Sequence, residues 1–288
     1  MNETQFETEL IQYITTGTIT KPECLAGIPE FSAVGLGNKF VKTKLWKHEP
    51  NIKTTSQLWD NFKQILEQHN QNVLEHPMSE VEFNQVKKII SDLHTPYEAG
   101  QFLYGLNGVS QIEIDLDDGR HVFLTVFDQK QIGAGDTVYQ VVNQIERPAV
   151  INGKMNRRFD TTLLINGLPM IQIEEKKDTH DVNEALNQMH QYIDEGQYGD
   201  IFSVLQILIA MTPNNVKYMA NTTSEKFNKD FAFNWQRKED NTIVRDWKEF
   251  ADSMLSIPMA HQMATNYMIL DGTPNKQTLK VMRPYQVY

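Results

Sequence analysis

The chain has 288 residues, and its 37 acidic side chains outnumber the 27 Lys and Arg, which gives a formal net charge of −10. This balance argues against a nonspecific coat for nucleic acid, because such binding depends on Lys and Arg displacing counterions from phosphates. It does not exclude a nuclease, since a divalent cation at a cleavage site needs carboxylate ligands. At roughly 150 residues per domain, the length allows one large domain or two modest ones.

The sequence also limits the cellular location and the metal chemistry. It holds no run of about 18 apolar residues that could span a membrane, and residues 1–9 are polar and acidic, unlike a signal peptide. We therefore expect a cytoplasmic protein. The single cysteine, Cys24, has no partner for an internal disulfide, and no Cys/His cluster has zinc spacing. Any bound metal is expected to have oxygen ligands.

The first hundred residues are predicted to be mostly helix and loop. Apolar residues recur at helical spacing in three segments, 4–14, 56–68 and 79–93. Between the first two of them, residues 16–50 contain four Gly and three Pro and give no clear signal. We therefore expect residues 1–100 to form an N-terminal helix followed by a helical and loop insertion.

After residue 100 the hydrophobic period changes from that of helices to that of strands. Apolar and polar residues alternate on both sides of the turn at 117–119, and residues 159–176 read as a second hairpin with its turn around Asn166-Gly167. Asp181 is a candidate N-cap for a helix that ends near Glu195.

Two more strands are predicted beyond this helix. Residues 201–211 are nearly all apolar, with Pro213 just after them, which is typical of a strand covered on both faces. Residues 216–220 are its expected neighbour. The order strand, strand, helix, strand predicts an α/β fold with a mixed central β-sheet flanked by helices.

Candidate chemistry lies on the second hairpin. Asp160 stands on its first strand, and Glu174 and Lys176 project from one face of its second strand, because side chains alternate along a strand. If the register sets Asp160 opposite Glu174, the two carboxylates lie about 5 Å apart. A slip of one residue would put them on opposite faces.

Two close carboxylates repel each other unless a cation lies between them, which makes this pattern suitable for a magnesium site. Mg²⁺ lowers the pKa of a bound water and neutralises charge on a phosphoryl oxygen. Lys176 would add a fixed positive charge that orients the attacking water or stabilises the phosphate. The alternative interpretation is a solvated strand end, since the run Glu-Glu-Lys-Lys is common at such places.

The motif Asp160…Glu174-x-Lys176 resembles the PD-(D/E)xK nuclease pattern, although Phe159 stands where the pattern has proline. The segment "RRFDTTLLINGLPMIQIEEKK", followed by "EALNQMHQY", is similar to the amino-terminal nuclease domain of the HsdR subunit of type I restriction enzymes. The similarity continues through "ANTT", "FAFNW" and "VMRPYQ", and so covers about residues 156–288.

The resemblance implies a restriction-endonuclease-like core over residues 101–260. In it, Asp160 and Glu174 would hold Mg²⁺, the backbone carbonyl of Glu175 would be a possible further ligand, and Lys176 would serve the attacking water. Glu175 departs from the family, which usually has an apolar residue at that position. We expect its side chain to face away from the site, toward solvent or a cation such as Lys177.

The resemblance also draws attention to a helix and to the first acidic residues. Gln188 and Tyr192 lie at i and i+4 on one helix face, as in the family's Gln-x-x-x-Tyr element, which supports cleavage through DNA contact or by positioning the site. Core packing of Tyr192 is an equally good interpretation.

Glu7 or Glu9 could bring another acid near the metal, although the helix dipole explains acids at this end equally well.

Residues 261–288 are expected to connect this core to an ATP-driven motor that the chain lacks. No Walker motif occurs in the sequence. Gln286 lies in an Arg-x-Tyr-Gln segment, which resembles the segments that recognise adenine in related motors. The chain would then be a fragment of a subunit that uses ATP. Its expected partners are double-stranded DNA and the methyltransferase and specificity subunits. Two alternatives stay open: a self-sufficient nuclease of repair or recombination, and a non-catalytic module whose first hundred residues dock onto the methyltransferase.

Overall fold

A computed structural model describes residues 2–16, 45–273 and 276–288 of the chain. Cys24 and most of the segment that gave no clear signal lie outside the described residues. Among the helices that the structure describes, none combines the length and the apolar character that crossing a membrane requires.

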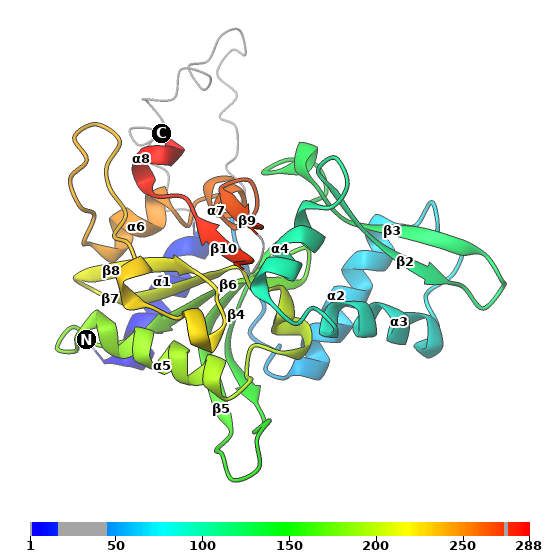
Figure 1. The fold of residues 1–288 in the computed structure, drawn as a ribbon, viewed down its shortest axis with the longest axis horizontal. Helices are drawn as coiled ribbons and strands as arrows, with labels where there is room; N and C mark the ends of the chain where they lie inside the picture. The colour runs from blue at the N-terminus through cyan, green and yellow to red at the C-terminus, as the bar shows by residue number, and fades with distance from the viewer. Residues whose placement is uncertain (1, 17–44, 274–275) are drawn as a thin grey trace, which may run out of the picture.

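The centre of the fold is a mixed six-stranded sheet, in the order β1-β4-β5-β6-β7-β8 (Figure 1). The β1–β4 and β6–β7 pairs are parallel and the other three pairs are antiparallel. The strands are β1 (Lys47–His48), β4 (Tyr139–Arg147), β5 (Arg157–Ile165), β6 (Leu168–Glu175), β7 (Ile207–Thr212) and β8 (Asn215–Ala220). The predicted α/β class with a mixed central sheet is confirmed, as is the second hairpin, which forms β5 and β6.

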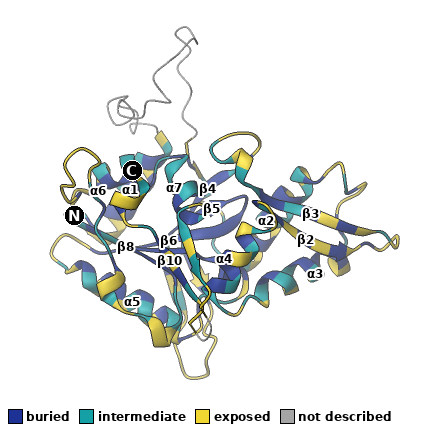
Figure 2. Ribbon diagram, turned by 45° about the horizontal axis from the view of Figure 1, so that its top comes forward, coloured by how far each residue is buried: buried dark blue, intermediate teal, exposed yellow. Residues whose placement is uncertain are grey.

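Helices cover both faces of this sheet. Helix α1 (Glu3–Thr16) lies behind β5 and β6 in Figure 1, and α5 (Val182–Asp194) lies in front, against β6 and β7. Asp181 caps α5 as predicted, since its side chain accepts a hydrogen bond from the backbone N–H of Asn183. The other helices near the sheet are α6 (Trp247–Ser253), α7 (Met259–Ala264) and α8 (Pro284–Val287). Every residue of β6 is buried, as the dark centre of Figure 2 shows.

A second group of elements lies beside the sheet, on the right of Figure 1. It consists of α2 (Thr55–His69), α3 (Glu80–Ser91), α4 (Pro96–Tyr104) and the hairpin of β2 (Val109–Asp115) and β3 (His121–Asp128). Thr54 and Ser79 start α2 and α3 with capping boxes, which satisfy backbone N–H groups of the first turn. Both predicted helices and the predicted hairpin are therefore present.

The remaining elements are short. A C-terminal hairpin consists of β9 (Met268–Asp271) and β10 (Thr278–Val281), which pair antiparallel. The 3-10 helices are η2 (Gln129–Gln131), η3 (Asp200–Val204), η4 (Ser224–Lys226) and η5 (Lys229–Phe231).

The single strand predicted over residues 201–211 is wrong. The first part of this run is η3, and only Ile207–Thr212 forms β7. Asp200, at a φ of 60°, begins the tight turn, and η3 then packs against β6, α3 and α4. Because both halves of the run are fully buried, hydrophobicity alone did not distinguish a buried turn from a buried strand.

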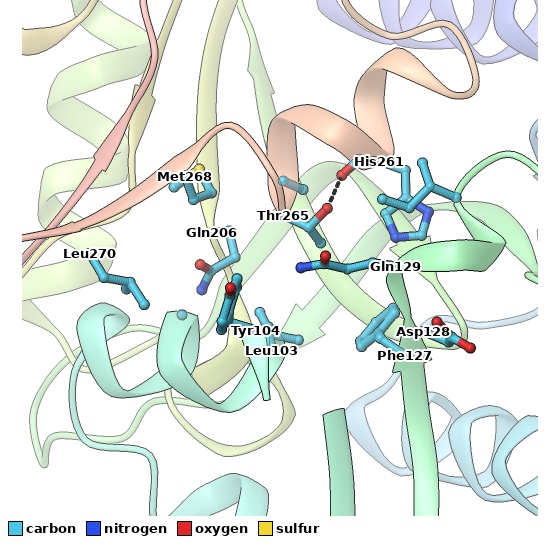
Figure 3. Close-up of a pocket in the computed structure, with 13 residues that line it drawn as sticks. Leu103, Tyr104, Phe127, Asp128, Gln129, Gln206, His261, Thr265, Met268 and Leu270 are labelled. Carbon is cyan, nitrogen blue, oxygen red and sulfur yellow. Dashed lines mark hydrogen bonds between the residues drawn. The ribbon is translucent and has the colours of Figure 1, made fainter. Parts of the chain in front are cut away.

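A small cavity lies between α4, β3 and the α7–β9 segment, and Figure 3 shows His261, Phe127 and Gln206 around it. Its volume of about 30 Å³ holds only a water molecule or two, so it is no substrate site. His261 is 2% exposed, and its Nδ1 lies 2.7 Å from the hydroxyl of Tyr139. That hydroxyl accepts from the N–H of Gly133 and can donate to the imidazole only when Nδ1 carries no proton.

We expect His261 to make the fold sensitive to acid. Burial lowers the pKa of His261 to about 4 from its ordinary 6.5. The unfolded chain therefore binds this proton first, so stability is lost as the pH falls from about 6.5 to about 4, by up to about 3 kcal/mol. The measurement is the free energy of unfolding against pH for the wild type and for His261→Asn, which keeps an acceptor but cannot be protonated there. Parallel curves for the two proteins would contradict the prediction.

Candidate active site

The β5–β6 hairpin sets the geometry of the predicted site. Asn166 and Gly167 form its turn at φ values of 51° and 81°, the left-handed conformations that a two-residue hairpin turn requires. The Asn166 side chain fixes the turn, because its Oδ1 accepts from the N–H of Val138 and its Nδ2 donates to the carbonyl of Val126.

A β-bulge decides which residue Asp160 faces. Next to the turn, Leu164 pairs with Pro169. Farther from the turn, the register is shifted by one residue, so that Thr161 pairs with Ile173. One step further along the strands, Asp160 stands level with Glu174. Without the bulge it would stand level with Ile173, and the two acids would point to opposite faces.

Asp160, Glu174 and Lys176 do meet at the end of this hairpin. Asp160 Oδ2 accepts a hydrogen bond from the backbone N–H of Glu175 at 3.0 Å. The ammonium of Lys176 donates to Glu174 Oε1 at 3.1 Å and to the carbonyl of Glu175 at 3.0 Å. Glu174 is fully buried and Lys176 is 9% exposed, so the ion pair lies in the low-dielectric end of the sheet rather than in solvent. The solvated-strand-end alternative does not fit this burial.

Glu175 faces away from Glu174 as expected, but its expected surroundings are wrong. Its side chain leaves β6 on the opposite face from Glu174, as alternation requires, but it is only 1% exposed. That face is covered by α1, and Glu7 of this helix brings a carboxylate oxygen within 4.8 Å of oxygens of Asp160 and Glu175. Glu175 therefore faces two further acids, rather than solvent or Lys177. Glu9, the other acid considered on α1, is half-exposed and hydrogen-bonds Gln5 instead.

The charges in this group shift one another's pKa. Burial raises the pKa of Asp160, Glu174 and Glu175, because a charged carboxylate loses solvation there. The negative charge of Asp160 raises the pKa of both glutamates further. Burial alone would lower the pKa of Lys176, but the charges of Glu174 and Asp160 outweigh it and hold that pKa above its usual value. Lys176 is therefore a fixed cation.

Three carboxylate oxygens of Glu174 and Glu175 are available to bind a ligand. Glu174 Oε2 and both carboxylate oxygens of Glu175 are buried and have no hydrogen-bond partner among the described residues. Buried acid groups are normally paired, hydrogen-bonded or bound to a metal. Because the available ligand atoms are all oxygens, they fit a hard divalent cation such as Mg²⁺.

Gln188 and Tyr192 lie on α5, beside this group. Gln188 is half-buried and donates from its side-chain amide to the hydroxyl of Tyr192. Tyr192 is 1% exposed, and its ring packs 5.0 Å from that of Phe159, the residue before Asp160. Burial, followed by the charge of Glu174, raises the pKa of Tyr192.

Three polar residues around Glu7 were missed by the sequence analysis. The side-chain amides of Asn143 and Gln144 donate to the two carboxylate oxygens of Glu7. Gln144 adopts a φ of 57°, which interrupts the pairing of β4 with β5 level with Asp160. Lys53 donates to Asn143 Oδ1 at 2.8 Å. Nothing in the alternating pattern of β4 signals this turn of the backbone, so these residues could only be found in the structure.

A mixed sheet with helices on both faces and an acid–lysine group at the end of a central hairpin defines a restriction-endonuclease-like α/β fold. Residues 35–227 match the family described as "Type I restriction enzyme R protein N terminus". This match covers more than half of the chain, and the chain belongs to that family.

Similar proteins carry endonuclease names. The chain is 32% identical over 238 residues to endonuclease subunits of type I restriction enzymes from Staphylococcus aureus and Staphylococcus saprophyticus. It is 37% identical over 174 residues to the endonuclease subunit of the EcoprrI type I restriction enzyme from Escherichia coli. The staphylococcal matches cover 82% of this chain but 24% of the relatives, and the E. coli match covers 59% of this chain and 52% of the relative. The chain thus spans about a quarter of the length of the staphylococcal relatives.

Proposed function

We propose that this chain is the Mg²⁺-dependent DNA endonuclease domain of a type I restriction enzyme R subunit, and that it hydrolyses phosphodiester bonds. The observation that supports this most is the buried group of Asp160, Glu174 and Lys176, in which Glu174 Oε2 has no hydrogen-bond partner among the described residues. The family match and the endonuclease names of the relatives point to the same function.

In this proposal Asp160 and Glu174 hold Mg²⁺, and the backbone carbonyl of Glu175 is a possible further ligand. When bound, Mg²⁺ supplies a water of lowered pKa and neutralises charge on a phosphoryl oxygen. Lys176, kept protonated by its two acid neighbours, orients the attacking water or stabilises the charged phosphate through Nζ. Because water is the nucleophile, the chain forms no covalent intermediate with DNA.

Gln188 and Tyr192 take the supporting roles. Tyr192 is buried between α5 and the sheet, so its contribution is to position Phe159 and the adjoining Asp160. Gln188 is half-buried and is the better candidate for a contact with DNA. Its amide also orients the Tyr192 hydroxyl.

We also propose how this domain belongs to a complete restriction enzyme. Double-stranded DNA is the substrate, methyltransferase and specificity subunits are partners in the cytoplasm, and ATP drives translocation by a motor outside this chain. Residues 1–100 are proposed as an N-terminal helix followed by a helical and loop insertion, residues 101–260 as the nuclease core, and residues 261–288 as the connector to the motor. Gln286 accepts a hydrogen bond from the backbone N–H of Arg283, so its exposed side chain caps α8 here.

Replacing Asp160 by Ala tests the proposal in the complete restriction enzyme. We expect DNA cleavage to be lost because the acid shared by the whole group is gone, while ATP hydrolysis continues because the motor lies elsewhere. Both activities are measured on the same preparation with unmodified plasmid. Asp178→Ala, an exposed acid just beyond the hairpin, is the control and should leave cleavage intact. Cleavage by the Asp160→Ala enzyme at the wild-type rate would refute the assignment.

The two alternatives predict different behaviour of this chain by itself. A self-sufficient repair or recombination nuclease of the same fold would nick plasmid with Mg²⁺ and without ATP. A non-catalytic assembly module would bind methyltransferase tightly but would bind neither Mg²⁺ nor Mn²⁺. The buried acid oxygens that have no hydrogen-bond partner among the described residues favour a cation-binding nuclease over the module.

A further inference from the structure

The loop that joins β4 to β5, residues 148–156, lies at the end of the sheet that carries the acid group. It extends from the bottom of the molecule in Figure 1, and all of its residues are exposed, as Figure 2 shows. The loop leads directly into β5, so Met155 lies five residues before Asp160. At about 3.3 Å per residue, five residues span at most about 17 Å. A DNA duplex that has a phosphate at Asp160 is therefore within reach of the loop.

Three large apolar side chains of this loop are exposed. Val150 is 60% exposed, Ile151 is 43% exposed and Met155 is 69% exposed. A single exposed apolar side chain is common and needs no explanation, but apolar side chains that gather on a protein surface often mark a binding site. Here three of them lie within six residues, and no described element covers them.

Hydrogen bonds within the loop give it a defined shape. The backbone N–H of Lys154 donates to the carbonyl of Ile151 across a tight turn, in which Gly153 has a φ of 83°. Nearer the strands, the side-chain oxygen of Asn156 accepts from the backbone N–H of Ala149 at 3.0 Å. The loop is therefore a preorganised two-stranded ribbon, and ordering it on binding costs less entropy than ordering a flexible segment.

The charge of this segment favours DNA as its partner. Residues 148–158 contain Lys154, Arg157 and Arg158 but no acid, although the whole chain has a net charge of −10. Arg157 forms an ion pair with Glu195, and Lys154 lies 4.0 Å from the same carboxylate. Arg158 is exposed and forms no ion pair among the described residues, not even with Glu146, which stands opposite it on β4. Exposed cations beside an apolar tip suit the phosphates and the groove of a duplex.

We propose that the β4–β5 loop enters a groove of the DNA duplex beside the cleavage site. Lys154 and Arg158 contact phosphates at the edges of the groove, which fixes the position of the duplex. The apolar side chains of the tip contact sugars and base edges inside the groove. The major groove, about 12 Å wide, admits a two-stranded ribbon. This inference rests on the proposed function, because it takes DNA as the ligand, and it names residues that place the duplex at the acid group.

The salt dependence of DNA binding tests these contacts. The 288-residue chain is titrated into a short fluorescent duplex in EDTA at several salt concentrations, so that neither cation binding nor cleavage enters the measurement. We expect Lys154→Met and Arg158→Met each to reduce the slope of log K against log salt by about 0.9, the value for one phosphate contact. Arg158→Lys keeps the charge and should keep the slope. Met155→Ser should weaken binding about tenfold at an unchanged slope, because it removes an apolar contact.

Matched controls come from α3, in the group of elements beside the sheet. Lys88→Met and Val81→Ser remove an exposed cation and an exposed apolar side chain there, and they should change neither the affinity nor the slope. Circular dichroism checks that each variant is folded.

Three outcomes would overturn the inference. The first is a wild-type chain that binds no duplex even at low salt, and the second is wild-type affinity and slope in all the loop variants. The third is normal DNA binding by these variants together with weaker binding to the methyltransferase, which would mean that the loop contacts a protein. Each of these leaves the nuclease proposal standing, because that proposal is tested by cleavage with the Asp160→Ala enzyme.

Discussion

Replacing Lys176 by Met is expected to slow DNA cleavage by the complete enzyme about a hundred- to a thousandfold while cation binding is retained. Lys176 Nζ donates to Glu174 and to the carbonyl of Glu175, and it forms an ion pair with the buried Glu174. Loss of one charged donor from a preorganised site typically costs this factor. Removing a positive charge beside the carboxylates should leave Mn²⁺ affinity equal or higher. The measurement pairs a single-turnover cleavage rate with an Mn²⁺ titration.

The neighbouring lysine provides the control for this prediction. Lys177 is exposed, directly after Lys176, so Lys177→Met should leave both cleavage and Mn²⁺ affinity unchanged. A Lys176→Met protein that loses Mn²⁺ binding together with cleavage would mean that Lys176 organises the acids rather than assisting the reaction. Full cleavage activity in that protein would exclude any role for Lys176.

The site could be located from the sequence, but its surroundings could not. The spacing of Asp160 and Glu174 on a hairpin indicated the pair, although only the bulge between Leu163 and Leu164 makes the register correct. Alternation along β6 correctly put Glu175 on the other face. It did not tell which element covers that face, because the packing of α1 depends on contacts far apart in sequence. Of the two acids considered on α1, Glu7 is therefore the one that lies near Asp160.

The fold was predicted best where the local pattern and the tertiary environment agree. The helices α2 and α3 have apolar stripes and capping boxes, so their sequences and their packing favour the same structure. In η3 the local pattern and the tertiary environment disagree, since a largely apolar segment that resembles a strand forms a turn in the core. The φ of 57° at Gln144 is another case, because a strand-like sequence takes a left-handed conformation there. Its amide then reaches Glu7, so this local irregularity serves the candidate site.

Replacing Arg147 by Met is expected to lower the free energy of unfolding by about 3 kcal/mol. Arg147 is 5% exposed, and its guanidinium donates to the carbonyls of Gln197 and Gly199 and to the hydroxyl of Thr55. Met fills similar space but leaves these carbonyls without their charged donor, and each such loss costs about 1–3 kcal/mol. The measurement is chemical denaturation of both proteins, with Arg158→Met, an exposed arginine of β5, as the control.

The effect of Arg147→Met should reach the candidate site through a chain of aromatic contacts. The guanidinium lies 4.9 Å from the ring centre of Phe202 in η3, and Phe202 packs edge-on against Phe159, whose ring centre is 5.0 Å away. Phe159 directly precedes Asp160, so a loosened η3 should let this acid move and weaken Mn²⁺ binding in the folded variant. A decrease of less than about 1 kcal/mol in the free energy of unfolding would mean that water replaces the lost donors. Unchanged Mn²⁺ affinity in a destabilised variant would confine the role of Arg147 to the loop after α5.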